Sequence, residues 1–188
     1  YGSFIGRGFE TIDDFRALVA EVKKSGGHFI KLMISGLMDF SQYGVLTGEP
    51  LPPDLIRDMI ACAHNEGFSV MAHANGDEAV RAALAGGVDS IEHGAYLTDE
   101  TLCQLAESGA VWVPTLVTIG NLIGCGRFPD EVLTPLLAYQ MNAVKKPPRR
   151  VQKLPAAATR ARTASCTGRA VWTSARSCAA PSKRVQTP

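Results

Sequence analysis

The chain has 188 residues, of which 46% are hydrophobic, and a formal net charge of +1, values typical of one globular domain with a sizeable core. We expect neither a membrane-spanning segment nor a secretory signal, because no stretch is apolar enough over the required length. The five cysteines form no C-x-x-C pair, and an odd number leaves one unpaired in any disulfide scheme. We therefore predict reduced thiols in a cytoplasmic protein.

The small net charge conceals two parts of opposite sign. Residues 1–144 carry eight basic and 18 acidic side chains, a net charge of −10, whereas residues 145–188 carry eleven basic side chains and no acidic one. This change of composition predicts a boundary near Lys146, with residues 1–146 on one side and a basic tail, residues 147–188, on the other.

The first predicted helix begins after Thr11, whose T-x-x-D spacing to Asp14 is typical of a capping box. Apolar residues follow at helical spacing, and the pair Gly26-Gly27 ends the helix. The sequence HFIKLMIS (28–35) then predicts a buried strand.

Lys31 lies inside this apolar strand. A buried lysine is costly unless its amine is paired, neutralised or directed into a polar cavity. One alternative is a lysine at the end of the strand with its ammonium group in solvent. The functional alternatives are a carbamate that binds metal and a nucleophile that forms a Schiff base.

A long loop, residues 35–53, follows the strand and is a candidate substrate-contacting element or lid. Asp39 and Tyr43 are its candidate substrate contacts, although each taken singly is more simply read as a solvated loop residue. Pro53 opens the next helix, and His64 near the end of that helix is predicted to be structural.

Two short strands that each end in a histidine come next. The runs FSVMAH (68–73) and DSIEHG (89–94) flank a helix predicted from Asp77 to Ala85, which makes a β-α-β unit. In such a unit the strands are parallel, so His73 and His93 emerge at the same edge. Neutral imidazoles bind zinc and other transition metals, so the pair favours a metal site over two unrelated core histidines.

The pattern continues beyond these strands. Thr98 caps a helix that Gly109 ends, AVWVPTLVT (110–118) predicts a fourth strand, and residues 129–143 predict a further helix. Four consecutive β-α units predict an α/β fold with a parallel sheet.

HFIKLMISG, MAHANGDEAVRAALAGGVDSIEHG and VWVPTL, in this order, resemble the fourth to seventh strands of metal-dependent amidohydrolases of the imidazolonepropionase-like and Xaa-Pro dipeptidase-like branch. The resemblance covers about residues 1–146 and implies a partial (β/α)8 TIM-type barrel. It also implies one or two divalent metal ions, with zinc favoured, and a carbamylated Lys31 that bridges them beside His73 and His93. Such a site activates water to hydrolyse a small amide, lactam or dipeptide. No nucleic-acid or membrane partner is implied, and a homo-oligomer is left open.

The chain departs from the family pattern at both ends. The family's first-strand H-x-H pair is absent, and no aspartate follows Asp130 to supply the last-strand proton shuttle. The parent gene is therefore expected to encode the complete site, and this fragment alone is expected to be inactive.

A shifted reading frame explains the basic tail. PPRRVQKLPAAATRAR (147–162) has a permitted coding sequence that, read two bases later, gives AAPGAKIACGSDAGA, a strand ending in a Ser-Asp motif. We hypothesise that residues 147–188 are a frameshift product; the alternative is a disordered basic arm that contacts nucleic acid or acidic lipid. For the whole chain, the alternatives are a Schiff-base lyase or aldolase that uses Lys31, and a non-catalytic truncated barrel.

Overall fold

The computed structural model describes residues 6–145 and 171–175. Within these ranges six strands form one sheet: β1 (Gly6–Phe9), β2 (Phe29–Met33), β3 (Ser69–Ala74), β4 (Ser90–His93), β5 (Val111–Val113) and β6 (Val171–Ala175). Their order is β1-β6-β2-β3-β4-β5, and all the pairings are parallel. This confirms the predicted α/β class with a parallel sheet.

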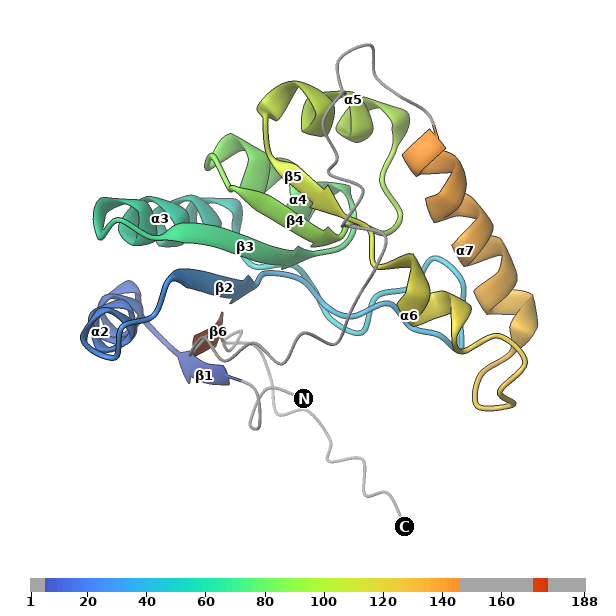
Figure 1. Ribbon diagram of the computed structural model, residues 1–188, viewed down its shortest axis with the longest axis horizontal. Coiled ribbons are helices and arrows are strands. Elements are labelled where there is room, and N and C mark those ends of the chain that lie inside the picture. The colour runs from blue at the N-terminus through green and yellow to red at the C-terminus, as the bar shows by residue number, and fades with distance from the viewer. Residues whose placement is uncertain (1–5, 146–170, 176–188) are drawn as a thin grey trace.

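The helices are α2 (Ile12–Lys24), α3 (Pro53–Asn65), α4 (Asp77–Ala85), α5 (Asp99–Ser108), α6 (Leu116–Gly120) and α7 (Asp130–Lys145). Helices α2 to α5 pack in sequence order. Their buried side chains join those of the central strands in one core. Helices α6 and α7 lie beyond the carboxyl ends of the strands (Figure 1). Among the described residues, no helix combines the length and apolarity needed to cross a bilayer.

Local sequence explains where these helices begin. The Thr11 side chain accepts a hydrogen bond from the Asp14 backbone N–H, and the Asp14 carboxylate accepts one from the Thr11 backbone N–H, so the predicted capping box is confirmed. The predicted Thr98 cap and the left-handed Gly109 end of α5 are also confirmed.

The central strands have two different faces. Ile30, Leu32, Val70, Ala72 and Ile91 have no exposed surface and belong to the helix-covered core. Because side chains alternate along a strand, the residues between them face the other side of the sheet. That second face carries Lys31, His73 and Glu92.

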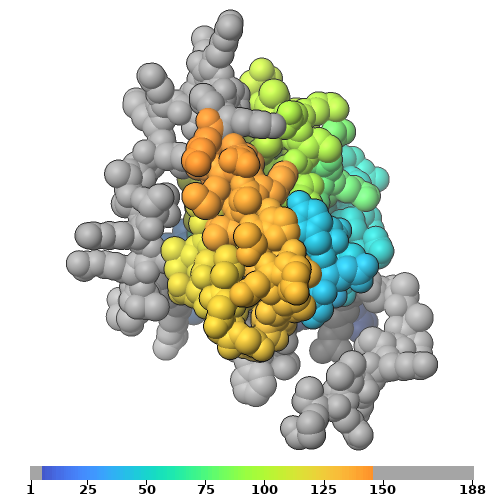
Figure 2. Space-filling view, turned by 90° about the vertical axis from the view of Figure 1, so that its right-hand side faces the viewer, coloured from blue at the N-terminus to red at the C-terminus, as the bar shows by residue number. Residues whose placement is uncertain are grey.

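A second apolar cluster lies at the carboxyl ends of the strands. It contains Met38, Ala95, Ile119, Leu133 and Leu136, which come from the loop after β2, the turn after β4, and helices α6 and α7. Figure 2 shows α7, the α6 region and this loop side by side on one face of the molecule.

The strand predicted over residues 110–118 is wrong in its second half. Strand β5 ends at Val113, and α6 begins at Leu116. Pro114 has no N–H to donate to a neighbouring strand, and Thr115 has a φ of 49°, which turns the chain out of the sheet.

One segment of the predicted basic tail, Val171–Ala175, forms strand β6. The backbone of β6 lies between β1 and β2, with Trp172 opposite both Gly6 and Lys31. The sequence VWTSA contains three residue types that favour strands. Residues 147–170 and 176–188 of the predicted tail lie outside the described residues, so the frameshift hypothesis stays a prediction.

Candidate functional site

The three predicted metal ligands lie on neighbouring strands. Lys31 is on β2, His73 on β3 and His93 at the end of β4. In the register of the sheet His73 is opposite Met33 and His93 is opposite Ala74, so Lys31 lies two residues deeper than His73 and three deeper than His93. The two imidazole rings have centroids 4.7 Å apart and an interplanar angle of 65°. The positive charge of Lys31 lowers the pKa of both rings, after the larger effect of burial.

His93 reaches this position through an unusual backbone conformation. Its strand neighbour Glu92 is opposite His73, so regular alternation would direct His93 toward the helix-covered face. Instead His93 has a φ of 72°, in the left-handed region that costs a residue other than glycine about 1–3 kcal/mol. The strand therefore ends at His93 and the ring turns toward His73.

Hydrogen bonds indicate which ring nitrogens are available. His73 Nε2 lies 3.1 Å from the backbone carbonyl of Gly36, which can only accept. Nε2 therefore carries the proton, and Nδ1 keeps its lone pair. His93 Nδ1 lies 2.6 Å from the Thr115 hydroxyl, so Nε2 is the nitrogen left for a ligand.

Both histidines are neutral at pH 7. Burial lowers the pKa of His73 below its ordinary range, opposed by its bond to Gly36. Burial, then His73 and then Lys31, lowers the pKa of His93 to about 3. An uncharged imidazole is the form that binds a metal ion.

Lys31 is 4% exposed. Burial lowers its pKa to about 8, against the opposing effect of Glu92. Its Nζ lies 4.0 Å from Glu92 Oε2. Part of the Lys31 population is therefore a neutral amine near pH 7, and only that form reacts with carbon dioxide or with a carbonyl.

The sequence reasoning missed two further buried groups. Glu92 is 8% exposed and also accepts a hydrogen bond from Ser90 Oγ at 3.0 Å. The signal that singled out Lys31, a charged residue within a buried strand, applies equally to Glu92.

Asn75, 1% exposed, is the second missed group. Its side chain donates to the carbonyl of Gly36 at 3.2 Å and accepts from the N–H of Ala95 at 3.1 Å. Its backbone N–H donates to Ser35 Oγ at 2.8 Å. Asn75 thus connects the ends of β2, β3 and β4, and local sequence gives no signal for this role.

The predicted substrate contacts lie in the loop after β2. The Asp39 carboxylate accepts the backbone N–H of Ser41 at 2.7 Å, which is a contact within the loop. Tyr43 is 47% exposed, and its ring lies 5.5 Å from that of Tyr96, in the turn after β4. These contacts organise the loop, and a substrate role for Asp39 and Tyr43 stays a prediction.

The residues present fit part of a metal site. Among the described residues, no group of three or more histidine, cysteine, aspartate and glutamate side chains could hold a metal ion. Lys31, His73 and His93 nevertheless offer two neutral imidazoles and an amine of lowered pKa. This donor set suits a divalent ion that takes its other ligands from elsewhere.

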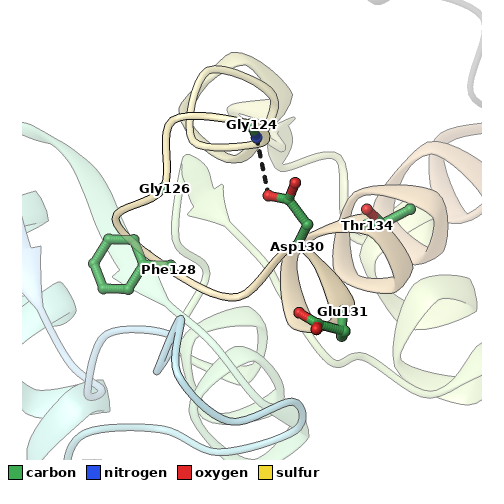
Figure 3. A pocket seen from close by; sticks show the side chains of 6 residues that line it. All are labelled: Gly124, Gly126, Phe128, Asp130, Glu131 and Thr134. Atoms are coloured by element: carbon green, nitrogen blue, oxygen red, sulfur yellow. Dashed lines mark hydrogen bonds between the residues drawn. The ribbon is translucent and has the colours of Figure 1, made fainter.

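A pocket of about 600 Å³ lies away from these side chains, at the start of α7 (Figure 3). It is lined by Gly124, Gly126, Phe128, Asp130, Glu131 and Thr134. The Asp130 carboxylate in it accepts the Gly124 backbone N–H at 2.9 Å, so this acidic group completes a turn.

Comparison with known proteins identifies the family. No protein-family model matches the sequence. Uncharacterized proteins of Mycobacterium bovis and Mycobacterium tuberculosis are 36% identical over 118 residues, which are 60% of this chain and 31% of each relative. A solved amidohydrolase is 31% identical with a TM-score of 0.62, over 74% of this chain and 35% of that one. The chain belongs to the amidohydrolase superfamily.

A solved prolidase complexed with N-methylphosphonate-L-proline is 30% identical to this chain, with a TM-score of 0.52, over 68% of this chain and 32% of the prolidase. The predicted superfamily is therefore confirmed, and a prolidase neighbour agrees with the dipeptidase-like branch. The chain spans about a third of the length of the proteins it matches.

Proposed function

We propose that the parent protein of this chain is a metal-dependent hydrolase that cleaves carbon–nitrogen bonds in small amides, lactams or dipeptides. The observation that carries the proposal is the convergence of Lys31, His73 and His93 at neighbouring strands, with both imidazoles neutral. Active sites of (β/α)8 barrels are built at the carboxyl ends of the strands, and amidohydrolase relatives support that architecture here.

In this proposal His73 Nδ1 and His93 Nε2 hold one divalent ion, for which zinc is the first candidate. The neutral amine of Lys31 adds to the carbon of carbon dioxide and loses a proton, which gives a carbamate with two oxygen donors and one negative charge. A bound metal would supply an activated water and polarise the scissile carbonyl.

The rest of the barrel belongs to the proposal as well. The missing histidine pair and the proton-shuttling aspartate would come from segments outside residues 6–145. We infer that the intact gene continues after Lys146 in another frame that encodes the Ser-Asp motif. On this view the present chain alone is inactive, because it holds only part of the ligand set.

The proposed substrate class follows from the prolidase neighbour. That protein was solved with a phosphonate analogue attached to proline. Dipeptides ending in proline and N-acyl amino acids are therefore the first substrates to test.

One observation favours a second candidate function. A buried lysine with a pKa of about 8 is also suited to forming a Schiff base with a carbonyl substrate. A lyase or aldolase of this kind would be trapped covalently on Lys31 by borohydride and would be indifferent to chelators.

The test uses the frame-corrected, full-length product of the gene beside its Lys31→Ala variant. The proposal predicts hydrolysis of proline dipeptides or N-acyl amino acids that a chelator abolishes, added zinc restores and Lys31→Ala lacks. Chelator-resistant activity with borohydride trapping on Lys31 would replace the hydrolase with the Schiff-base enzyme.

A further inference from the structure

The left-handed backbone of His93 needs an explanation, because strain of this kind persists only where surrounding contacts enforce it. We propose that Trp112 and Gln140 are positioning residues that hold His93 with its imidazole against His73. This inference rests on the proposed function and deepens it by naming what orients one of its metal ligands.

Two side chains bind the backbone of His93 directly. The indole Nε1–H of Trp112 donates to the His93 carbonyl at 3.0 Å, and the Gln140 amide Nε2–H donates to the same carbonyl at 3.3 Å. The last backbone pair between β4 and β5 is Glu92 with Val113, so His93 lies just beyond the ladder. The side chains of Trp112 and Gln140 therefore donate to the carbonyl that the next backbone hydrogen bond between β4 and β5 would have used.

Gly94 makes the approach of Trp112 feasible. Gly94 has a φ of 60°, and a Cβ built on it would lie 2.5 Å from Trp112 Nε1. Any larger residue would therefore push the indole away from the His93 carbonyl.

Gln140 occupies a position where a polar residue is costly. It has no exposed surface on α7, and its Oε1 has no hydrogen-bond partner among the described residues. An unsatisfied buried polar atom carries a desolvation cost that an apolar residue of the same size would avoid. The hydrogen bond to His93 is the contact that gives a glutamine a role here.

The imidazole is fixed from a second direction. Thr115 Oγ1 lies 2.6 Å from His93 Nδ1, and Thr115 follows Trp112 closely in the segment that leaves β5. The carbonyl is thus bound by Trp112 and Gln140, and the ring is bound by Thr115. With both ends of the residue constrained, Nε2 keeps one direction, which is the requirement for a preorganised ligand.

The test measures ring geometry and metal binding in this same chain. Trp112→Phe keeps an aromatic ring and removes the indole N–H donor. Gln140→Met keeps a side chain of similar volume and removes the amide N–H donor. Tyr139→Phe is the matched control, because it removes a hydrogen bond from the neighbouring position of α7 to the carbonyl of Leu97 without touching His93. Denaturant unfolding establishes that the variants compared are folded, and Trp112→Phe decides the case if Gln140→Met does not fold.

We expect the nuclear Overhauser contacts between the His73 and His93 rings to weaken in Trp112→Phe and Gln140→Met, and zinc affinity measured by calorimetry to fall about tenfold or more. Tyr139→Phe should leave both readouts unchanged. Ring contacts that persist in both donor variants would overturn the inference. If the unaltered chain binds no zinc, the ring contacts alone decide the roles of Trp112 and Gln140, and the proposed function, which takes its remaining metal ligands from segments outside residues 6–145, is tested separately on the full-length product.

Discussion

The buried Lys31 predicts an unusual dependence of stability on pH. Its pKa falls from an ordinary 10.5 to about 8 in the folded chain, because burial outweighs the attraction of Glu92. Between these two values the unfolded chain retains a proton that the folded chain has released. The free energy of unfolding should therefore rise as pH increases from about 8 to 10.5, and be insensitive to this group below that window.

The size of the effect follows from the pKa difference. A change of one in pKa corresponds to about 1.4 kcal/mol, so Lys31 should contribute roughly 3 kcal/mol across the window. Lys31 is 4% exposed, so solvent screening reduces this figure little. Tyrosines and cysteines titrate in the same range, but they are common to the chain and to a Lys31→Met variant.

The assay is urea unfolding of both proteins from pH 7 to pH 10.5, in buffers free of carbon dioxide so that no carbamate forms. The difference between the two stabilities should change by roughly 3 kcal/mol in favour of the unaltered chain as pH rises. Parallel curves would contradict this prediction, because they would mean that Lys31 keeps an ordinary pKa in the folded state.

Three further predictions concern local structure. Gly94→Ala should lower the free energy of unfolding, measured by urea unfolding, by about 2 kcal/mol more than Gly109→Ala does. Both glycines have a positive φ, but only Gly94 has Trp112 packed against it. Equal losses in the two variants would contradict this prediction. Thr11→Ala should cost about 1 kcal/mol of thermal stability through the lost cap and leave zinc affinity unchanged. Although burial raises the pKa of Asp89, its bonds to Val70 and His64 lower it overall. The free energy of unfolding should therefore fall in acid as Asp89 becomes protonated. The same titration of Asp89→Asn should show a smaller fall in the free energy of unfolding.

The sequence was enough to predict that Lys31, His73 and His93 lie on neighbouring strands. Strand periodicity alone puts His73 and His93 at strand ends, and parallel β-α-β connectivity brings those ends to one edge. Lys31 was found because a charge within an apolar strand is conspicuous. These inferences depend on local pattern and on the handedness of the connection, both of which are legible in one sequence.

The geometry of the site could not be predicted in the same way. The left-handed turn at His93 depends on Gln140, which is 47 residues away, and on the indole of Trp112. The sequence marks Glu92 as a charge within a buried strand, but only the structure shows that its carboxylate lies 4.0 Å from the Lys31 amine. The pairing of β6 with β1 and β2 joins opposite ends of the chain, and no local signal specifies such a pairing.

Whether His73 and His93 bind metal can be measured as the metal content of the frame-corrected, full-length gene product, compared with its His73→Ala and His93→Ala variants after dialysis against zinc. We expect one or two tightly bound ions per chain in the unaltered protein and a loss of bound metal in each variant. Equal metal content in all three proteins, or none in any, would contradict this expectation and leave His73 and His93 as structural histidines.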